Sequence, residues 1–477
     1  MEEETDIKRK IKEVISKSLD AEVYSNIIKD FFTKGIDRNS PYLSSLKILP
    51  NYTDDQLYNK FKANKDILCR FIRNLKDHNL DIYKVLSCIY GSFYGDAIGG
   101  FCEFRSPSNE NCKKIFRDKP VFGQKKGQIT DDSEMSMCFA FAIMDTPEKE
   151  NIDGNYLYFY YGAWTKSNPI DIGKTTKAAF KDYDFKICYP KNKMFDEIKK
   201  NIEKDNNKSL SNGFLMRKST FIAWIYYRFY GEINKAFESI TDNQNLLKLY
   251  EKIKYFCHFD NCTTHPNPQT DSASSFYCLM AIGAIKGFRA NNIIDKIYNL
   301  CKNNYFHKED ENNPDCYVAN LIIKTIDKFK NPNFKFIENF GNKNSEDFVG
   351  KHIGFYEHAF KLTLYYLVNY DSYDNEKTRF KLILDEICNL GGDTDTNACI
   401  VGGVIGPLIG LNNFGNNFDK VLEVIPRNRS LFSICLMVPY IQYLKKSNRN
   451  KQLIKDERVF LKTILTILYD DIEIDYS

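Results

Sequence analysis

The stretch Gly391-Gly392-Asp393-Thr394-Asp395-Thr396-Asn397-Ala398 decides how this chain is organised, and it runs directly into an uncharged segment at 399–406. Two glycines can turn the backbone sharply, and two aspartates and two threonines follow within four positions. The pattern predicts a cluster of oxygen ligands at the start of a helix. It is equally typical of a capping loop, in which Asp395 or Thr396 accepts hydrogen bonds from free backbone N–H groups.

A second cluster of the same kind, Thr130-Asp131-Asp132-Ser133, precedes the hydrophobic run at 135–144. Two such clusters at two helix starts can face each other across one site. Neither contains His or Cys, and hard oxygen donors suit Mg²⁺ or Mn²⁺ better than zinc. A cation between the clusters would also offset the repulsion among their carboxylates.

Five stretches in one order resemble the ADP-ribosylglycohydrolases related to dinitrogenase reductase-activating glycohydrolase. They are GSFYGDAIG at 91–99 with Glu103, TDDS at 130–133, SNGFLMR at 211–217, THP at 264–266 and GGDTDTNA at 391–398. A sixth, DIGKTT at 171–176, looks like the family's substrate loop. The resemblance covers roughly residues 86–412 and leaves both ends of the chain unexplained.

The resemblance implies two bound metal ions, Mg²⁺ or Mn²⁺. The ligands that it implies come from the two Thr/Asp clusters: Thr130, Asp131, Asp132, Asp393, Asp395 and Thr396. Two positions depart from the family pattern, because Ser133 replaces the usual threonine and Phe214 stands where a small residue is common.

The same resemblance implies three catalytic residues: Glu103 as a gating or acid/base group, Asp171 as the aspartate that handles the opened or strained ribose, and Asp132. The substrate-binding positions that it implies are Asp96, Gly173, Asn212, Gly213, His265, Gly354 and Tyr356. The local patterns leave structural alternatives open, since Asp171 and Asn212 are also ordinary N-cap residues. Asp96 and Glu103, seven residues apart, are expected on one helix face, where burial would be costly without a partner.

The implied activity is hydrolysis of the bond between ribose C1 and a leaving group, with release of ADP-ribose from modified protein side chains or from ADP-ribose-containing small molecules. One alternative is a pseudoenzyme that binds ADP-ribose without turnover, although all six ligand positions are intact. Another is a Mg²⁺-dependent phosphoester hydrolase, which would need a basic phosphate clamp that the sequence does not identify.

Composition narrows the remaining classes. The 477 residues are 43% hydrophobic and 27% charged, with a net charge of only +4 that is mixed along the chain, so neither nucleic-acid binding nor membrane association is expected. The 14 scattered cysteines and the acidic start, without an apolar signal segment, predict a cytoplasmic, intracellular protein. A zinc site from Cys257, His258, Cys262 and His265 is a minor alternative. The apolar run at 398–411 is too short to span a bilayer, and Pro407 interrupts it.

Helical periodicity dominates the sequence, which predicts an all-α, orthogonal multi-helix domain. The expected organisation is a helical N-terminal extension at 1–85, a catalytic domain at 86–412 with an insertion near 303–350, and C-terminal helices at 413–477 that pack on the core. Gly91 and Gly95 predict close helix packing, and residues 189–210 are expected to form a surface loop. The oligomeric state stays open.

Overall fold

The computed structural model describes Lys76 and residues 80–415, apart from gaps at 124–126, 146–151, 166–168, 184–194, 239–242, 304, 307–311 and 374. Most of the expected N-terminal extension and nearly all of the expected C-terminal helices lie outside these residues. Within them, all regular structure is helical except for one isolated antiparallel bridge between Ser211 and Phe355. The predicted all-α class is therefore confirmed for the described part of the chain.

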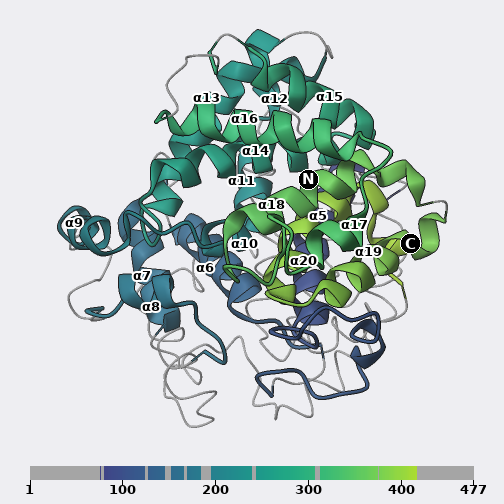
Figure 1. Ribbon diagram of the computed structural model, residues 1–477. Helices are drawn as coiled ribbons and strands as arrows, with labels where there is room; N and C mark the ends of the chain where they lie inside the picture. The colour runs from purple at the N-terminus through teal and green to yellow at the C-terminus, as the bar shows by residue number, and fades with distance from the viewer. Residues whose placement is uncertain are drawn as a thin grey trace, which may run out of the picture.

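The helices are labelled in Figure 1. The α-helices are α5 (Leu80–Gly99), α6 (Asp131–Asp145), α7 (Gly154–Thr165), α8 (Lys174–Ala179), α9 (Phe195–Asn206), α10 (Gly213–Met216), α11 (Lys218–Arg228), α12 (Tyr230–Glu238), α13 (Asn243–Asn261), α14 (Pro268–Ile285), α15 (Ala290–Cys301), α16 (Pro314–Phe329), α17 (Phe336–Phe340), α18 (Tyr356–Val368), α19 (Glu376–Leu390) and α20 (Thr394–Ile409). Short 3₁₀ turns are η1 (Cys112–Lys114), η3 (Tyr370–Ser372) and η4 (Leu411–Asn413).

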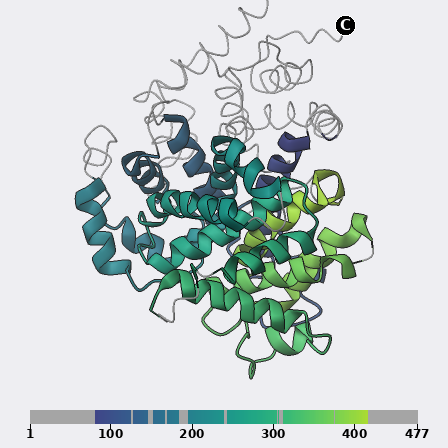
Figure 2. The same cartoon turned by 90° about the horizontal axis from the view of Figure 1, so that it is seen from above.

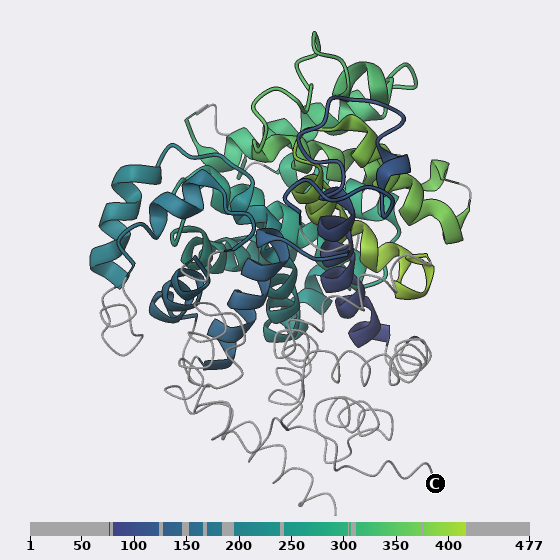
Figure 3. The ribbon, with the colours of Figure 1, turned by 90° about the horizontal axis from the view of Figure 1, so that it is seen from below.

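Helices α5 and α20 pack against each other along almost their full lengths in the middle of the described part, purple beside yellow-green in Figures 1, 2 and 3. Glycines make this approach possible. A Cβ added at Gly91 would collide with the carbonyl oxygen of Gly402, and one added at Gly95 would collide with that of Ala398. The predicted close packing at Gly91 and Gly95 is confirmed. It also brings the end of α5 beside Asp395, at the start of α20.

Helix α14 is buried on every side from Thr270 to Ile285 and packs against α20, α13 and α16. Its uncharged sequence after Asp271 explains this position, because a helix that is apolar all round belongs in a core. The Tyr277 hydroxyl donates to the carbonyl oxygen of Ile400 at 2.8 Å, which ties α14 to α20. Helix α14 therefore packs against α20 and α5, which approach each other at their glycines.

The expected surface loop at 189–210 is wrong for much of its length, because residues 195–206 form α9. This helix is strongly charged, which suggested a loop, but Phe195 and Ile202 lie on one face and are buried. A narrow apolar stripe on a charged helix is enough to bind it to the core.

Among the described helices, none combines the length and the apolar character that crossing a bilayer requires. The run at 398–411 instead forms most of α20, with Pro407 inside the helix.

Candidate active site

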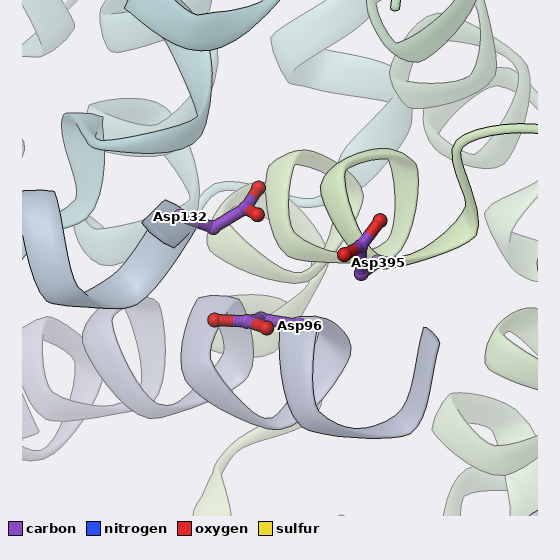
Figure 4. Close-up of side chains that lie close together, drawn as sticks. All are labelled: Asp96, Asp132 and Asp395. Carbon is purple, nitrogen blue, oxygen red and sulfur yellow. The ribbon is translucent and has the colours of Figure 1, made fainter. Parts of the chain in front are cut away.

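Three helices bring carboxylates to one point. Asp96 lies on α5, Asp132 in the first turn of α6 and Asp395 in the first turn of α20, and all three are buried. One oxygen from each lies within 4.8 Å of the others, and Figure 4 shows the three side chains gathered between their helices. Residues of the two Thr/Asp clusters therefore meet at one point, as two similar clusters at two helix starts suggested.

A second group of carboxylates shares a member with the first. Glu103, Asp393 and Asp395 also offer oxygens within 4.8 Å of one another. Because Asp395 belongs to both groups, the structure has two adjacent acidic positions, each of which could hold a metal ion.

Unpaired oxygens show that these groups fit a cation. Asp132 Oδ1 and Glu103 Oε2 are buried and have no hydrogen-bond partner among the residues that the structure describes. A buried carboxylate oxygen without a partner is costly, and a bound cation would supply that partner. All of the donors are oxygens, which suits Mg²⁺ or Mn²⁺.

The carboxylates also share a direction of pKa shift. Burial raises the pKa of Glu103 to about 9, and the nearby charges of Asp393 and Asp171 add to the shift. Burial likewise raises the pKa of Asp132 and of Asp395 well above the usual range, with further contributions from neighbouring carboxylates. Among the described residues, burial and the neighbouring carboxylates thus disfavour the charged forms of these groups, and a bound cation would offset this.

Asp96 holds the start of α6. Both of its oxygens accept from the backbone N–H of Thr130 at 3.0 Å, and Oδ2 accepts from the backbone N–H of Ser133 at 3.2 Å. The Thr130 and Ser133 hydroxyls also donate to it. These are the free N–H groups at a helix start, so Asp96 caps α6 from a neighbouring helix. Ser133 supplies the hydroxyl that a threonine would supply there.

Capping explains only part of the surroundings of Asp395. The N-cap of α20 is Asp393, which makes no side-chain capping bond. Asp395 Oδ1 accepts from the adjacent N–H of Thr396 at 2.9 Å. This N–H lies in the first turn of α20, so the capping interpretation holds for one Asp395 oxygen, while the same carboxylate also lies within 4.8 Å of the other carboxylates.

Glu103 lies beyond the end of α5, in the turn that follows Gly99, so the expectation that it shares a helix face with Asp96 is wrong. The next residues are tied to the other cluster by two backbone hydrogen bonds: Phe104 N–H donates to Gly392 O at 2.7 Å, and Gly392 N–H donates to Arg105 O at 3.1 Å. Helix α5 ends beside the start of α20, and the turn that follows places Glu103 close to Asp393 and Asp395.

Asn212 and Gly354 support Asp393. The Asn212 side-chain amide donates to Asp393 Oδ2 at 2.6 Å, and its backbone N–H donates to Gly354 O at 2.8 Å. Gly354 has a φ of +84°, which favours glycine. Asn212 makes no side-chain cap for α10, so the simple N-cap interpretation is not supported.

Gly213, His265 and Tyr356 form a packed wall beside Asn212. A Cβ added at Gly213 would lie 3.1 Å from His265 Cε1, and Phe214 packs its ring against both His265 and Tyr356. Tyr356 is fully buried, and its hydroxyl accepts from the Gln269 amide at 2.7 Å. The Tyr356 side chain thus supports the wall from behind Phe214 instead of facing solvent.

Asp171 is half-buried before α8, and the helix begins only at Lys174, with Gly173 at the N-cap and no side-chain capping bond. Its oxygen Oδ1 accepts from the adjacent Ile172 N–H at 2.7 Å. Burial raises the pKa of Asp171, and the charge of Asp393 raises it further. Asp171 therefore lies within electrostatic range of the acidic groups, and Gly173 lies at the surface beside it.

One buried charge cluster has no counterpart in the sequence expectations. Arg217 Nε donates to both Asp260 oxygens at 3.2 Å, Lys218 pairs with the same carboxylate, and all three side chains are buried. The adjacent Arg217 and Lys218, which precede an apolar stretch, could have indicated a buried ion pair. Their partner Asp260, however, lies 43 and 42 residues away in the sequence.

The minor zinc alternative is not supported. Within the part of the chain that the structure describes, the groups of potential metal ligands contain neither cysteine nor histidine. His258 Nδ1 lies 2.9 Å from Asp271 Oδ2, and the Cys262 thiol donates to Phe259 O.

Comparison with known proteins agrees with the motifs. Protein L543 of Acanthamoeba polyphaga mimivirus, which carries the name of an ADP-ribosyl glycohydrolase, is 28% identical over 340 residues, 69% of this chain and 88% of its own length. The ADP-ribosyl-(dinitrogen reductase) glycohydrolase of Rhodospirillum rubrum is 29% identical over 104 residues, 21% of this chain and 34% of its own. A solved ADP-ribosylglycohydrolase-related protein complex superposes with a TM-score of 0.48 at 14% identity, over 76% of this chain and 99% of that one. The sequence model of the ADP-ribosylglycohydrolase family matches residues 78–421, and the chain belongs to this family.

Proposed function

We propose that this protein is a metal-dependent hydrolase that releases ADP-ribose from ADP-ribosylated protein side chains or from related ADP-ribose conjugates. The observation that carries the proposal is the position of Asp395, which belongs to two adjacent groups of buried carboxylates. Family membership supplies the substrate class.

The metal ligands in this proposal are Thr130, Asp131, Asp132, Asp393, Asp395 and Thr396. A bound Mg²⁺ or Mn²⁺ supplies positive charge that orients hydroxyl groups and lowers the pKa of a water molecule. Asn212 keeps Asp393 in position through its amide, and Asp96 keeps α6 in position through the capping bonds. Both residues therefore serve the site without needing contact with the reacting atoms.

Proton transfer is assigned to Glu103. Its carboxyl is buried beside Asp393 and Asp395, and one of its oxygens has no partner, so it is available to a reacting group. Asp171, whose charge contributes to the raised pKa of Glu103, is assigned to the ribose. Gly173, Gly213, His265 and Gly354 are assigned to binding the rest of the substrate.

The test is direct release of ADP-ribose. Purified protein with Mg²⁺ or Mn²⁺ is incubated with arginine-linked and serine-linked ADP-ribosylated peptides, ADP-ribose polymer and O-acetyl-ADP-ribose. Release from at least one of these substrates, lost on chelation and in Asp395→Ala, is the expected result. No release from any of the four, with tight ADP-ribose binding retained, would favour a binding protein without turnover.

A further inference from the structure

A line of hydrogen bonds runs from the buried Arg217 guanidinium to the first turn of α8. Arg217 Nη1 donates to Thr264 Oγ1 at 2.9 Å, and this hydroxyl lies 2.7 Å from His265 Nδ1. On the other side of the ring, His265 Nε2 lies 2.7 Å from Ser211 Oγ. The Ser211 hydroxyl in turn donates to Thr175 Oγ1 at 3.2 Å.

The surroundings of the histidine in this line favour its neutral form. His265 is fully buried, and its burial lowers the pKa well below the usual value, with a further contribution from the Arg217 charge. Asp260, the carboxylate that opposes the shift, is already paired with Arg217 and Lys218. A neutral imidazole donates from one nitrogen and accepts at the other, so the ring gives the line a direction.

The Thr264 hydroxyl decides that direction. Arg217 can only donate, so Thr264 Oγ1 accepts from it, and within the described residues the only other partner of this hydroxyl is His265 Nδ1. If Nδ1 carried the proton, two donors would face Oγ1, and the hydroxyl's own proton would have no acceptor. Leaving a buried donor unpaired is costly. With the proton on Nε2, Thr264 donates to Nδ1, Nε2–H donates to Ser211, and Ser211 keeps its proton for Thr175.

The line ends on the segment that carries two site residues. Thr175 Oγ1 also lies 2.8 Å from Ser209 Oγ, and the Asn206 amide donates both to Thr175 O and to Thr264 O. Thr175 lies in the first turn of α8, just after Asp171 and Gly173 in the chain. Its contacts therefore join α8 to the segment before α10 that contains Ser209 and Ser211. If the His265 proton were on Nδ1, Ser211 would donate to Nε2 instead, and Thr175 would lose the hydrogen bond from Ser211.

We propose that Arg217 and Thr264 are positioning residues, which hold His265 as the neutral tautomer with its proton on Nε2 and thereby fix the start of α8 beside Asn212. The effect of this arrangement on ADP-ribose binding rests on the proposed function, whereas the assignment of the tautomer does not.

The tautomer is measured by NMR on full-length protein labelled with ¹⁵N-histidine, through correlations between ring nitrogens and ring carbon protons. The His265 signals are those that disappear in His265→Gln. Between about pH 6 and 8 we expect a protonated Nε2 and an unprotonated Nδ1, because the neutral ring is buried. A proton on Nδ1, or a doubly protonated ring, would overturn the proposal.

Matched variants test which neighbour sets the tautomer. Thr264→Val keeps the shape and removes the hydroxyl, so the single tautomer should give way to a mixture, whereas Thr264→Ser should retain it. Ser211→Ala removes the other neighbour and should leave the proton on Nε2. A shift to Nδ1 in Ser211→Ala, or an unchanged tautomer in folded Thr264→Val, would contradict the assignment to Thr264; if Thr264→Val does not fold, the Ser211→Ala result decides.

Binding adds a functional readout. Thr264→Val should weaken ADP-ribose binding about tenfold by calorimetry, the size expected from one lost hydrogen bond, and Thr264→Ser should restore it. Equal binding by wild type and folded Thr264→Val would refute the positioning role. Failure of the wild type itself to bind ADP-ribose would count against the proposed function, and the NMR result would stand apart from it.

Discussion

Two clusters of buried charged side chains lie in the described core, and they differ in whether neighbouring side chains balance their charge. At the starts of α6 and α20, Asp395 lies close to Asp132 in one group and to Glu103 in the other, and two of the carboxylate oxygens have no hydrogen-bond partner among the described residues. Behind α10, Asp260 is bonded by Arg217 and Lys218 and also accepts from the Tyr161 hydroxyl. The first cluster could hold a cation from outside the chain, and the second contains its own cationic side chains.

The pKa directions follow this difference. Burial raises the pKa of Asp395, and the neighbouring Glu103 and Asp132 raise it further. Burial also acts on Asp260, but Arg217 and Lys218 outweigh it, so the net pKa of Asp260 is lowered. Equal burial therefore does not indicate an equal role: an ion cluster that is complete within the chain is structural, and an incomplete one is a candidate binding site.

The largest expected effect is on the incomplete cluster. Asp395→Asn removes the carboxylate that both groups share, so Mg²⁺ and Mn²⁺ binding by calorimetry and ADP-ribose release should both fall below detection. The melting temperature in chelator should stay equal or rise, because a buried charge without compensation has been removed. Metal binding at the wild-type level in this variant would contradict the metal site.

Glu103→Gln separates chemistry from structure at the same place. The amide keeps the shape of the side chain but cannot transfer the proton, so turnover should fall by about 10²- to 10⁴-fold while the protein stays folded. Glu110→Gln, at an exposed position seven residues later, is the matched control and should leave turnover unchanged. If Glu103→Gln unfolds the protein, its role is structural.

The complete cluster should behave in the opposite way. Asp260→Asn leaves Arg217 and Lys218 buried without compensation, so we expect a loss of about 3–5 kcal/mol in the free energy of unfolding, measured with urea. Asp295→Asn, which breaks an exposed pair with Lys330, should change it by less than about 1 kcal/mol. Similar losses in the two variants would mean that Asp260 is not structural.

Local patterns were enough to single out two Thr/Asp stretches as candidate parts of one site. The Thr/Asp clusters are short stretches at helix starts, so the positions of Asp132 and Asp395 follow from a few neighbouring residues. The close packing at Gly91 and Gly95 was predictable for the same reason. The helical class was also accessible, although the charged residues of α9 hid its narrow apolar stripe.

Contacts between distant segments were not accessible in this way. Asn212 reaches Asp393 across 181 residues, and Asp96 caps α6 across 34. Both assignments depend on where helices cross, and no local pattern reports a crossing. Glu103 shows the same limit, since its seven-residue spacing from Asp96 suggested one helix face, yet α5 ends at Gly99, where α20 packs against it.

The smallest expected effect is a change in the free energy of unfolding at acid pH, and it depends on Asp260 and its partners Arg217 and Lys218. The pKa of Asp260 is lowered in the folded protein, so its contribution to stability is fully present above the pKa of an unfolded aspartate, about 3.9, and is lost as the pH falls through the folded value. The difference in unfolding free energy between wild type and Asp260→Asn should therefore be constant from about pH 7 to 5 and should shrink below about pH 4. Asp315 and Asp347, whose pKa values are also lowered, are present in both proteins, so their acid sensitivity cancels in the comparison. Urea unfolding of both proteins at several pH values measures this difference in free energy. A difference that grows as the pH falls would show that Arg217 and Lys218 do not hold Asp260 in its charged form.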